Sequence, residues 1–428
     1  MRFKEHSAII VLLFCYCCIQ LYSLTTPADI WWDAAVYMNM GTYIYSLGHV
    51  GLWEDVRPLI WPMIVGFFWK IGFDELLWAK IVTILFSIGT LLLTYITGCK
   101  YFNKNTGIVA ALFLACSPLF FLYTSVLQTE IPATFFFLLG LMAGSFAGSI
   151  WIGISFLTRF FQGFLILPFI VYSIIKKQFC SFCFLIPILF FLAINYVLYE
   201  NPFTPFIRQA YMTLHTGWIF HQPGYYYFTE LFKENYLWIF AFAGIYFAVK
   251  KKEYLIPFLL LCGFAPFAFA AHKELRILLP LLPFLFMLTA YGLLELFSWK
   301  YAALFLAIWF VVTVPQLHFN TYDDHLDFFY TANVSEKAWI SNPSFIINKN
   351  VLAEPLYYPL YNSEKIQELL AKRHEAKTIL LNSCDVLPCP DDACIADHAL
   401  FLETLKKEFA VRTLAYKNCD YYIFQSLE

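Results

Sequence analysis

The residues best suited to do chemistry in this chain of 428 residues are a few ionisable groups at the ends of long apolar segments. Asp33 directly follows the first apolar segment, in the sequence WWDAAVY. On a helix Asp33 and Tyr37 would share one face, because they are four residues apart. The pattern makes Asp33 and Tyr37 candidate functional residues, because an ionisable group at a membrane boundary is unusual in a chain with so few charges. The structural alternative is an acid that stabilises the N-terminus of a helix.

Glu130 is the second candidate catalytic acid. It stands in the sequence QTEIP, at the start of the fourth apolar segment. Proline and an acid are both favourable in the first turn of a helix, so a purely structural role is as well supported as a catalytic one.

The candidate substrate-binding residues, mostly cations, lie in two further places. The sequence HKELR supplies His272, Lys273, Glu274 and Arg276 between two apolar segments. A loop needs fewer charges than this to stay in water, and arginine and lysine N–H groups are suited to phosphate. Arg159 lies within apolar sequence, where an arginine is costly unless it pairs or faces a cavity.

The composition indicates what kind of structure must position these groups. Hydrophobic residues make up 61% of the chain and charged residues 14%, whereas soluble domains have about 25% charged residues. Residues 1–317 carry 32 of the charges and residues 318–428 carry 26, which is about 10% and about 23% of each part. This distribution predicts a membrane-embedded helical body, residues 1–317, and a soluble C-terminal domain, residues 318–428. The net charge of −2 gives no basic face for nucleic acid.

Eleven apolar segments are candidate transmembrane helices, since a full crossing needs about 20 residues. They are residues 8–24, 76–98, 107–126, 131–148, 150–158, 162–175, 179–199, 236–249, 254–270, 277–297 and 301–317. With a cytoplasmic N-terminus, every inside loop contains lysine, as the positive-inside rule requires, and the C-terminal domain lies outside the cytoplasm. A cleaved signal peptide at residues 1–24 is the alternative to a retained first helix.

The first outer loop is long, residues 25–75. Its apolar part, from Arg57 to Gly72, contains two prolines and is flanked by charges. These features favour a helix that lies along the membrane interface rather than across the bilayer.

The C-terminal domain has a small α/β pattern, with strands expected at residues 345–347, 378–381 and 421–424 and helices at 363–373 and 399–409. It also contains Cys384, Cys389, Cys394 and Cys419. Outside the cytoplasm, four cysteines indicate two disulfides, with three possible connectivities. A zinc site is the alternative, although the spacing is looser than that of paired CxxC motifs.

The order and sidedness of the charged groups in residues 1–317 resemble the GT-C superfamily of polytopic glycosyltransferases. Asp33 with Tyr37 looks like that family's first-loop acid motif, and Arg57 with Pro58 looks like the start of its juxtamembrane helix. Glu130 takes the place of the second-loop acid. The segments LTR, which ends at Arg159, and HKELR are similar to two further stretches of family members. These members include protein O-mannosyltransferases, aminoarabinose transferases and dolichyl-phosphate-mannose-dependent mannosyltransferases.

The resemblance implies a membrane glycosyltransferase that takes a sugar, with mannose favoured, from a polyprenyl or dolichyl phosphate. The acceptor is a hydroxyl group of a glycan, lipid or protein on the outer face. Asp33 would act as the base, and Glu130 would orient the acceptor or share the base role. Arg57, Lys273, Arg276 and Arg159 would hold the lipid phosphate. The reaction would invert the anomeric carbon. A divalent metal is compatible with these acids, but no ligand spacing diagnoses one.

Two other classes of protein remain as alternatives. A transporter or lipid flippase also places ionisable groups in helices, but it predicts charges near the middle of the membrane and an internal repeat. The charges of this chain lie mainly at the predicted outer face, and the sequence has no evident repeat. A non-catalytic scaffold would not need the charged groups of the outer loops.

Overall fold

The computed structural model describes residues 6–144, 146–215, 220–270, 272–322, 326–334, 337–357, 363–386, 389 and 391–427. The chain forms two compact units. The first unit comprises Met1–Thr26, Asp55–Trp61 and Ala79–Asn320, and the second comprises Pro27–Glu54, Pro62–Trp78 and Thr321–Glu428. Each unit is described by itself below.

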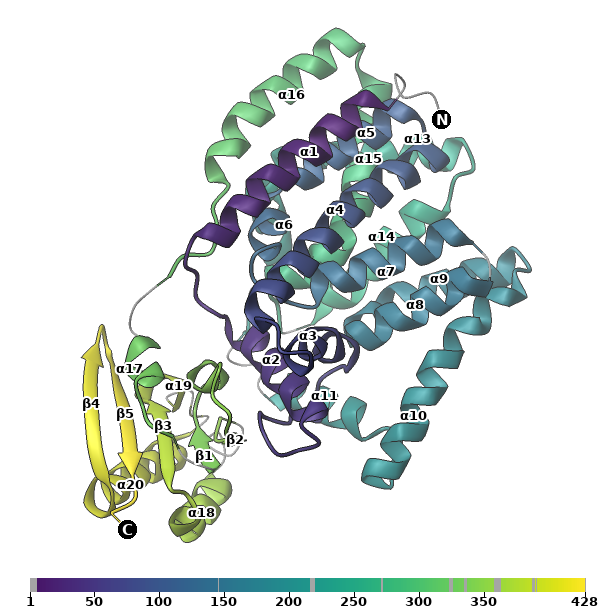
Figure 1. Cartoon of the computed structure of the whole chain (residues 1–428). Helices are drawn as coiled ribbons and strands as arrows, with labels where there is room; N and C mark the ends of the chain where they lie inside the picture. The colour runs from purple at the N-terminus through teal and green to yellow at the C-terminus, as the bar shows by residue number, and fades with distance from the viewer. Residues whose placement is uncertain are drawn as a thin grey trace. The chain divides into compact units, whose positions relative to one another are not determined.

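The first unit is helical (Figure 1). Its helices are α1 (Ser7–Tyr22), α4 (Glu75–Tyr101, whose first turn belongs to the second unit), α5 (Lys104–Ala115), α6 (Pro118–Tyr123), α7 (Glu130–Ala143), α8 (Phe146–Thr158), α9 (Gly163–Ile175), α10 (Leu185–Tyr199), α11 (Thr204–His215), α12 (Tyr226–Glu234), α13 (Ala241–Lys250), α14 (Leu255–Phe269), α15 (Leu282–Leu296) and α16 (Trp299–Thr313). Short 3₁₀ helices join several of them, including η3 (Phe160–Gln162) and η6 (Leu275–Leu281).

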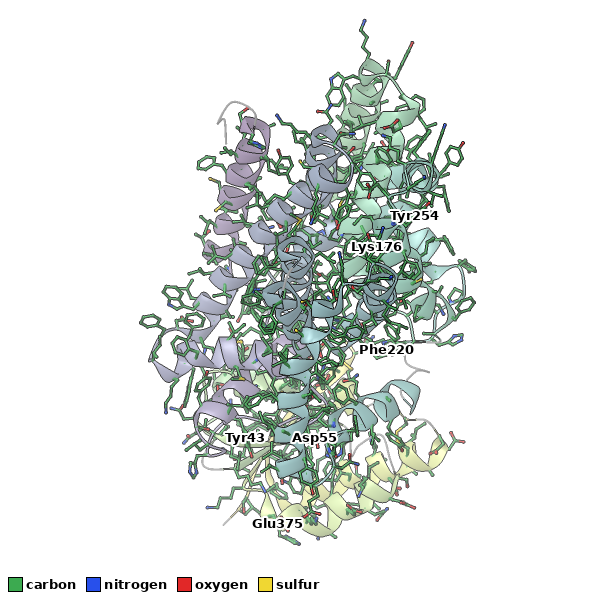
Figure 2. The ribbon with its side chains drawn as sticks, turned by 90° about the vertical axis from the view of Figure 1, so that its right-hand side faces the viewer. Tyr43, Asp55, Lys176, Phe220, Tyr254 and Glu375 are labelled. Atoms are coloured by element: carbon green, nitrogen blue, oxygen red, sulfur yellow. A yellow bond between two sulfur atoms is a disulfide. The ribbon has the colours of Figure 1, made fainter. Side chains whose placement is uncertain are left out.

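The predicted polytopic helical membrane fold is confirmed. By length and composition, five helical stretches could cross a membrane: Ser7–Thr25, Glu75–Tyr101, Cys180–Tyr199, Leu275–Leu296 and Trp299–Gln316. Six further apolar helices of 10–17 residues overlap the remaining predicted segments. The segment predicted as one span over 107–126 is divided into α5 and α6. The loop residues Lys176 and Tyr254 lie toward the end of this unit that carries the N-terminus, and Phe220 and Asp55 lie toward the other end (Figures 1 and 2).

Helix α15 is the central element of the first unit. From Leu282 to Leu293 it is buried throughout, so its environment is protein rather than lipid. Its crossing with α13 depends on two glycines, because a Cβ atom at Gly244 would overlap the carbonyl of Leu288 and one at Gly292 would overlap that of Phe240. Small residues at a helix crossing let two backbones approach closely, which is the usual way in which membrane helices associate.

Polar side chains in α4 satisfy their hydrogen bonds within the helix. The hydroxyls of Thr83, Thr90 and Thr94 each donate to the carbonyl four residues earlier, at 2.7–2.8 Å. All three side chains are fully buried. In a medium without water, this local bonding lets a polar residue remain in a spanning helix.

The second unit combines the first outer loop with the C-terminal domain. The loop supplies α2 (Trp32–Tyr45) and most of α3 (Ile60–Lys70). With 11 residues, α3 is too short to cross a bilayer, which needs about 20 residues. Its exposed residues Met63 and Phe67, followed by Ile71, form an apolar stripe at four-residue spacing, as expected for a helix at a membrane interface.

The C-terminal domain is a five-stranded sheet with helices, which confirms the predicted small α/β domain. The strands β1 (Lys337–Ile340), β2 (Leu352–Pro355), β3 (Thr378–Asn382), β4 (Ala410–Tyr416) and β5 (Cys419–Gln425) have the order β2-β1-β3-β5-β4. The first three are parallel, and β5 is antiparallel to both β3 and β4. One hydrophobic core lies between the sheet and the helices α18 (Ser363–Lys372) and α20 (Asp392–Glu408), and another covers the opposite face.

The first outer loop takes part in that second core. Leu52 is fully buried among residues of β1, β3 and β5. The backbone of Gly51 continues the sheet beyond β2, since its N–H donates to Val351 and its carbonyl accepts from Ala353, both at 2.8 Å. The amide of Asn39 on α2 donates to the carbonyl of Pro343 at 2.8 Å. Sequence alone places residues 25–75 with the membrane part, whereas these contacts join residues 27–54 to the C-terminal domain.

One predicted strand is wrong. The apolar run of residues 345–347, with one aromatic and two β-branched residues, predicts a strand, but Pro343–Ile346 forms a 3₁₀ helix. Asn342 starts it, since its side chain accepts a hydrogen bond from the N–H of Ser344 at 3.0 Å. A proline at the first position, which favours a helical turn, overrides the strand propensity.

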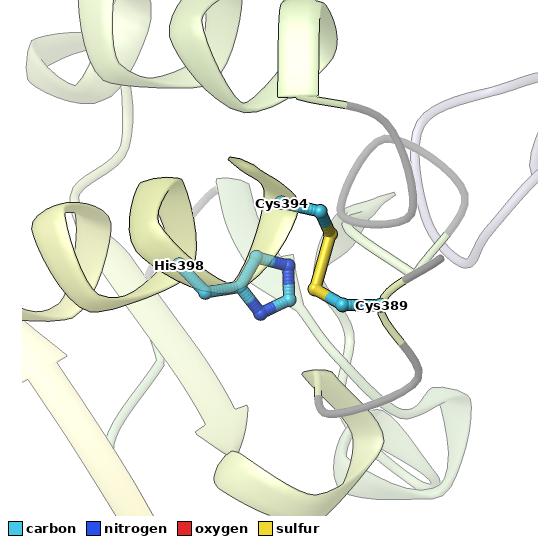
Figure 3. A group of neighbouring side chains, drawn as sticks. All are labelled: Cys389, Cys394 and His398. Carbon is cyan, nitrogen blue, oxygen red and sulfur yellow. A yellow bond between two sulfur atoms is a disulfide. The ribbon is translucent and has the colours of Figure 1, made fainter. Parts of the chain in front are cut away.

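The four cysteines of the domain form two disulfides. Cys384 pairs with Cys419 and Cys389 pairs with Cys394. The first joins α19 (Ser383–Val386) to the start of β5, and the second closes a loop onto the first turn of α20. His398, one turn further along α20, lies beside the second disulfide (Figure 3). Because metal binding needs thiolates, sulfurs that are joined in a disulfide do not support the zinc alternative.

Candidate functional site

The candidate site of the first unit starts from Glu130, the first residue of α7. Its side chain is fully buried and forms an ion pair with Arg159, whose Nη1 lies 2.8 Å from Oε1 of Glu130. The same Nη1 donates to the hydroxyl of Thr129 at 3.1 Å. Arg159 has an extended backbone between the end of α8 and the start of η3. This interruption of the helix lets its side chain reach the start of α7.

The HKELR segment forms the second half of the site. Glu274 accepts from His272 Nε2 at 2.7 Å through one oxygen, and its other oxygen lies 2.7 Å from Nε of Arg276. Arg276 also donates through Nη1 to the side-chain oxygen of Gln128 at 3.0 Å. Gln128 and Thr129 therefore connect the two arginines through adjacent residues of one segment.

The segment that carries these residues is itself fixed. The indole N–H of Trp61 donates to the carbonyl of Leu127 at 3.0 Å, and the Trp61 side chain is fully buried. Leu127 adopts a left-handed backbone with φ of 63°, which costs energy in a residue with a Cβ atom. The chain thus turns sharply just before Gln128, and the Trp61 bond holds that turn.

The electrostatics of the cluster favour ionised groups. Burial alone would raise the pKa of Glu274, but the hydrogen bond from His272 and the charge of Arg276 together lower it below its usual value. Lys273, Arg159 and Arg276 provide three fixed positive charges against the negative charges of Glu130 and Glu274. The two arginines balance the two glutamates, and Lys273, whose Nζ is bonded to backbone carbonyls, adds one positive charge to the same segment.

Lys273 is positioned differently from the arginines. Its side chain is buried, and Nζ donates to the backbone carbonyls of Ala270 and, at 3.3 Å, Gln222. Its backbone N–H donates to the carbonyl of Phe220 at 3.1 Å, and the Phe220 ring lies 4.6 Å from that of His272. Lys273 thus ties residues 220–222 to the HKELR segment, and its role in phosphate binding stays a prediction.

The remaining predicted residues lie elsewhere in the chain. Asp33 is half-buried in the first turn of α2, and Tyr37 is buried one turn later; both belong to the second unit. Arg57 is half-buried and belongs to the first unit with Glu130. Each of these three makes further contacts. The structure therefore brings together Glu130, Arg159 and the HKELR residues.

Some members of the site were missed by sequence reasoning. Gln128 and Thr129 bond the two arginines, and the hydroxyl of Tyr227 donates to the carbonyl of Glu274 at 3.4 Å. Gln128 and Thr129 directly precede Glu130, so a search for neutral hydrogen-bonding residues beside each candidate acid would have found them. Tyr227 gives no such signal, because it is remote in the sequence.

The described residues do not form a metal site at this cluster. Within the described ranges, one group of three or more His, Cys, Asp or Glu side chains could share an ion, namely Cys389, Cys394 and His398, and its sulfurs are disulfide-bonded. Glu130 is already engaged with Arg159. The donor set at the cluster therefore does not fit a divalent cation, and the mechanism proposed below uses none.

The sequence of the chain matches one protein family over part of its length. Residues 56–199, about a third of the chain, match the family model of dolichyl-phosphate-mannose-protein mannosyltransferase. No curated protein sequence matches the chain significantly.

Solved structures are similar over nearly the whole chain. ArnT from Cupriavidus metallidurans bound to undecaprenyl phosphate has a TM-score of 0.58 at 13% identity, over 93% of this chain and 76% of that one. The oligosaccharyltransferase AglB from Archaeoglobus fulgidus, in complex with an inhibitory peptide and a dolichol-phosphate, gives 0.55 at 12%, over 100% and 75%. The apo form of the Archaeoglobus fulgidus oligosaccharyltransferase gives 0.61 at 11%, over 96% and 73%. At these identities the likeness shows the fold.

Proposed function

This integral membrane protein has the GT-C fold that its sequence predicts, and we propose on that basis that it is a glycosyltransferase. It transfers a sugar from a polyprenyl or dolichyl phosphate to a hydroxyl acceptor. The observation that carries the proposal is the cluster of Glu130, Arg159, Glu274 and Arg276, in which two arginine–glutamate pairs are joined through Gln128 and Thr129. The family match and the lipid phosphates bound by the similar ArnT and AglB structures support the choice of donor.

The chemistry requires a base and an anion site. The acceptor oxygen attacks the anomeric carbon, the bond from that carbon to the phosphate oxygen breaks, and the bonding electrons leave with the phosphate. Asp33 takes the proton of the acceptor hydroxyl. Arg276, Arg159 and Arg57 stabilise the charge on the departing lipid phosphate, with a contribution from Lys273.

Glu130 has a positioning role in this scheme. Its ion pair holds the guanidinium of Arg159 in place, with Nη1 2.8 Å from Oε1 of Glu130. Attack from the side opposite the phosphate inverts the anomeric carbon, as in inverting glycosidases. Mannose is the sugar that the family match favours.

The orientation belongs to the same proposal. With the N-terminus in the cytoplasm, the lysine-containing loops lie inside, and the second unit lies outside the cytoplasm. The two disulfides support this placement, because disulfides persist in oxidising compartments. Transfer then takes place at the outer face.

Asp33→Asn tests the proposed base. We expect label transfer from a radiolabelled polyprenyl-phosphate sugar to membrane acceptors to fall by about 10²–10⁴-fold. Asp29→Asn, in the same loop, is the matched control and should keep near wild-type transfer. Wild-type rates in Asp33→Asn would remove Asp33 from the mechanism. A wild-type protein that moves lipid or solute across proteoliposomes without transferring sugar would favour the transporter alternative.

A further inference from the structure

A polar cavity lies wholly within the second unit. Its volume is about 160 Å³, and it is bordered by α2, α3, the first turn of α4 and the segment after the 3₁₀ helix Pro343–Ile346. Its lining consists of Met38, Asn39, Thr42, Trp69, Glu75, Ile346, Ile347, Asn348, Lys349 and Asn350. Since a water molecule occupies about 30 Å³ in the liquid, this space can take a group the size of one small ring.

Glu75 is the unusual residue of this cavity. Its side chain is 8% exposed, and its Oε1 has no hydrogen-bond partner among the residues that the structure describes. Its other oxygen accepts one long bond, 3.5 Å, from the hydroxyl of Thr42. A buried carboxylate with so little hydrogen bonding is costly. A ligand that donates hydrogen bonds would remove that cost.

The ionisable groups of the lining favour a neutral ligand. Glu75 and Lys349 are the two ionisable residues of the lining, one acidic and one basic. Nζ of Lys349 is held by the carbonyls of Ala332, at 2.6 Å, and Tyr330, at 3.2 Å. A buried carboxylate would repel a phosphate, and one carboxylate beside a lysine is a poor site for a divalent cation.

The neutral groups of the lining suit a sugar ring. Asn39, Asn348 and Asn350 can donate and accept hydrogen bonds, as hydroxyl groups do. The amide of Asn39 is fixed by its bond to Pro343. Trp69 is half-buried and, with Met38 and Ile347, offers apolar surface to the C–H face of a ring. We propose that this cavity binds a neutral pyranose, with two adjacent hydroxyls of the sugar donating to the carboxylate of Glu75.

This site is separate from the proposed catalytic acid. Asn39 and Thr42 come six and nine residues after Asp33, which at 3.6 residues per turn places them about 240° and 180° around α2 from it. The cavity therefore lies against a face of α2 other than the face that carries Asp33 and Tyr37. Sugar binding here requires no transfer reaction, so it is measurable whether or not the proposed function holds.

The experiment measures binding to the full-length chain in detergent. Methyl glycosides of mannose, glucose, galactose and N-acetylglucosamine are titrated, with saturation-transfer difference NMR and tryptophan fluorescence as readouts. We expect at least one glycoside to bind saturably, and Glu75→Gln and Trp69→Leu each to weaken it at least tenfold. Glu364→Gln, an exposed glutamate on α18 of the same unit, is the matched control and should bind like the wild type.

The outcomes separate the ligand classes. Inorganic phosphate, Mg²⁺ and methylammonium are titrated in parallel, and none should compete with the glycoside. The proposal is overturned if no glycoside saturates the wild-type protein, or if both variants bind like the control. Binding of Mg²⁺ or methylammonium that depends on Glu75, without glycoside binding, would also overturn it and identify a cation site. Circular dichroism of each variant establishes that a loss of binding is not a loss of fold.

Discussion

The two units of this chain bury charge in different ways. In the first unit, the acids Glu130 and Glu274 are each held by an arginine, within an apolar helical body whose exposed side chains are largely Phe, Leu, Ile and Val. In the second unit, Glu75 and Asp385 are acids that form no ion pair with any of the residues that the structure describes. That unit is held by a sheet core and two disulfides.

The difference follows from the two solvents. A membrane offers no water to a side chain, so a charge there must be paired or directed at a cavity. A domain in water can tolerate an isolated buried acid, because the acid can take up a proton or meet a polar ligand. Pairing is not general in the first unit, because the buried Glu234 accepts hydrogen bonds from the Ser117 hydroxyl and the N–H of Leu119 and makes no ion pair among the described residues. It distinguishes the acids beside Arg159 and Arg276, Glu130 and Glu274.

The largest expected effect comes from breaking a pair in the first unit. Arg159→Met leaves Glu130 buried without its partner and should lower the free energy of unfolding by about 3–5 kcal/mol. The exposed pair of Lys251 and Glu295, 2.9 Å apart in the same unit, is the matched control, and Lys251→Met should cost about 0–1 kcal/mol. Unfolding in detergent, followed by circular dichroism, measures both.

A double variant sharpens that result. Arg159→Met with Glu130→Gln removes the buried charge as well as its partner and should recover most of the lost stability. If Arg159→Met is no less stable than Lys251→Met, the Arg159–Glu130 pair is not buried.

The disulfides of the second unit should differ in their contributions. Cys384 and Cys419 are 35 residues apart, and Cys389 and Cys394 are 5 apart. From the entropy of loop closure, we expect losses of about 4 kcal/mol for a Cys384→Ala and Cys419→Ala double variant and about 2 kcal/mol for the other pair. Denaturant unfolding monitored in the C-terminal domain tests this order. Equal losses would show that native-state packing, and not loop length, governs them.

The joining of the first loop to the C-terminal domain gives the next prediction. Leu52→Ala removes a fully buried side chain from the core of the sheet and should cost about 3 kcal/mol. Leu47→Ala changes a residue that is 87% exposed in the same loop and should have little effect. Hydrogen exchange of β1 and β3 is the measurement. If their protection does not change in Leu52→Ala, the loop is not part of that core.

The apolar helices could be predicted from the sequence because each carries its signal in its own residues. The candidate acids and cations could also be predicted, since charge is rare in apolar sequence and stands out there. Gln128 and Thr129 could be found only through their position beside Glu130, because neutral polar residues give no such contrast. Tyr227 could not be predicted, because it is remote in the sequence from the residues that it contacts. The pairing of Gly51 with β2 could not be predicted either, since it joins residues about 300 positions apart. The 3₁₀ helix at Pro343–Ile346 was missed because strand propensity was weighed above the proline.

The smallest expected effect is a pH dependence of opposite sign in the two units. In the second unit, burial raises the pKa of Asp385 to about 7, although hydrogen bonds from Ser341, Asn342 and Asn382 oppose the rise. The folded state then binds the proton more tightly than the unfolded state, so this contribution to stability is full below pH 4 and is lost as the pH rises to about 7. In the first unit, the lowered pKa of Glu274 gives a contribution that is present above the usual glutamate pKa and is lost at lower pH.

Two variants separate these contributions. Unfolding measured from pH 3 to pH 8 should show a smaller decline between pH 4 and pH 7 in Asp385→Asn, and a smaller loss below pH 4 in Glu274→Gln. Each variant should leave the pH window of the other unchanged, because the two acids belong to different units. If Asp385→Asn keeps the full decline in the free energy of unfolding toward pH 7, Asp385 is solvated in the folded protein. The contrast between the paired acids of the first unit and the isolated acids of the second then rests on Glu75 alone.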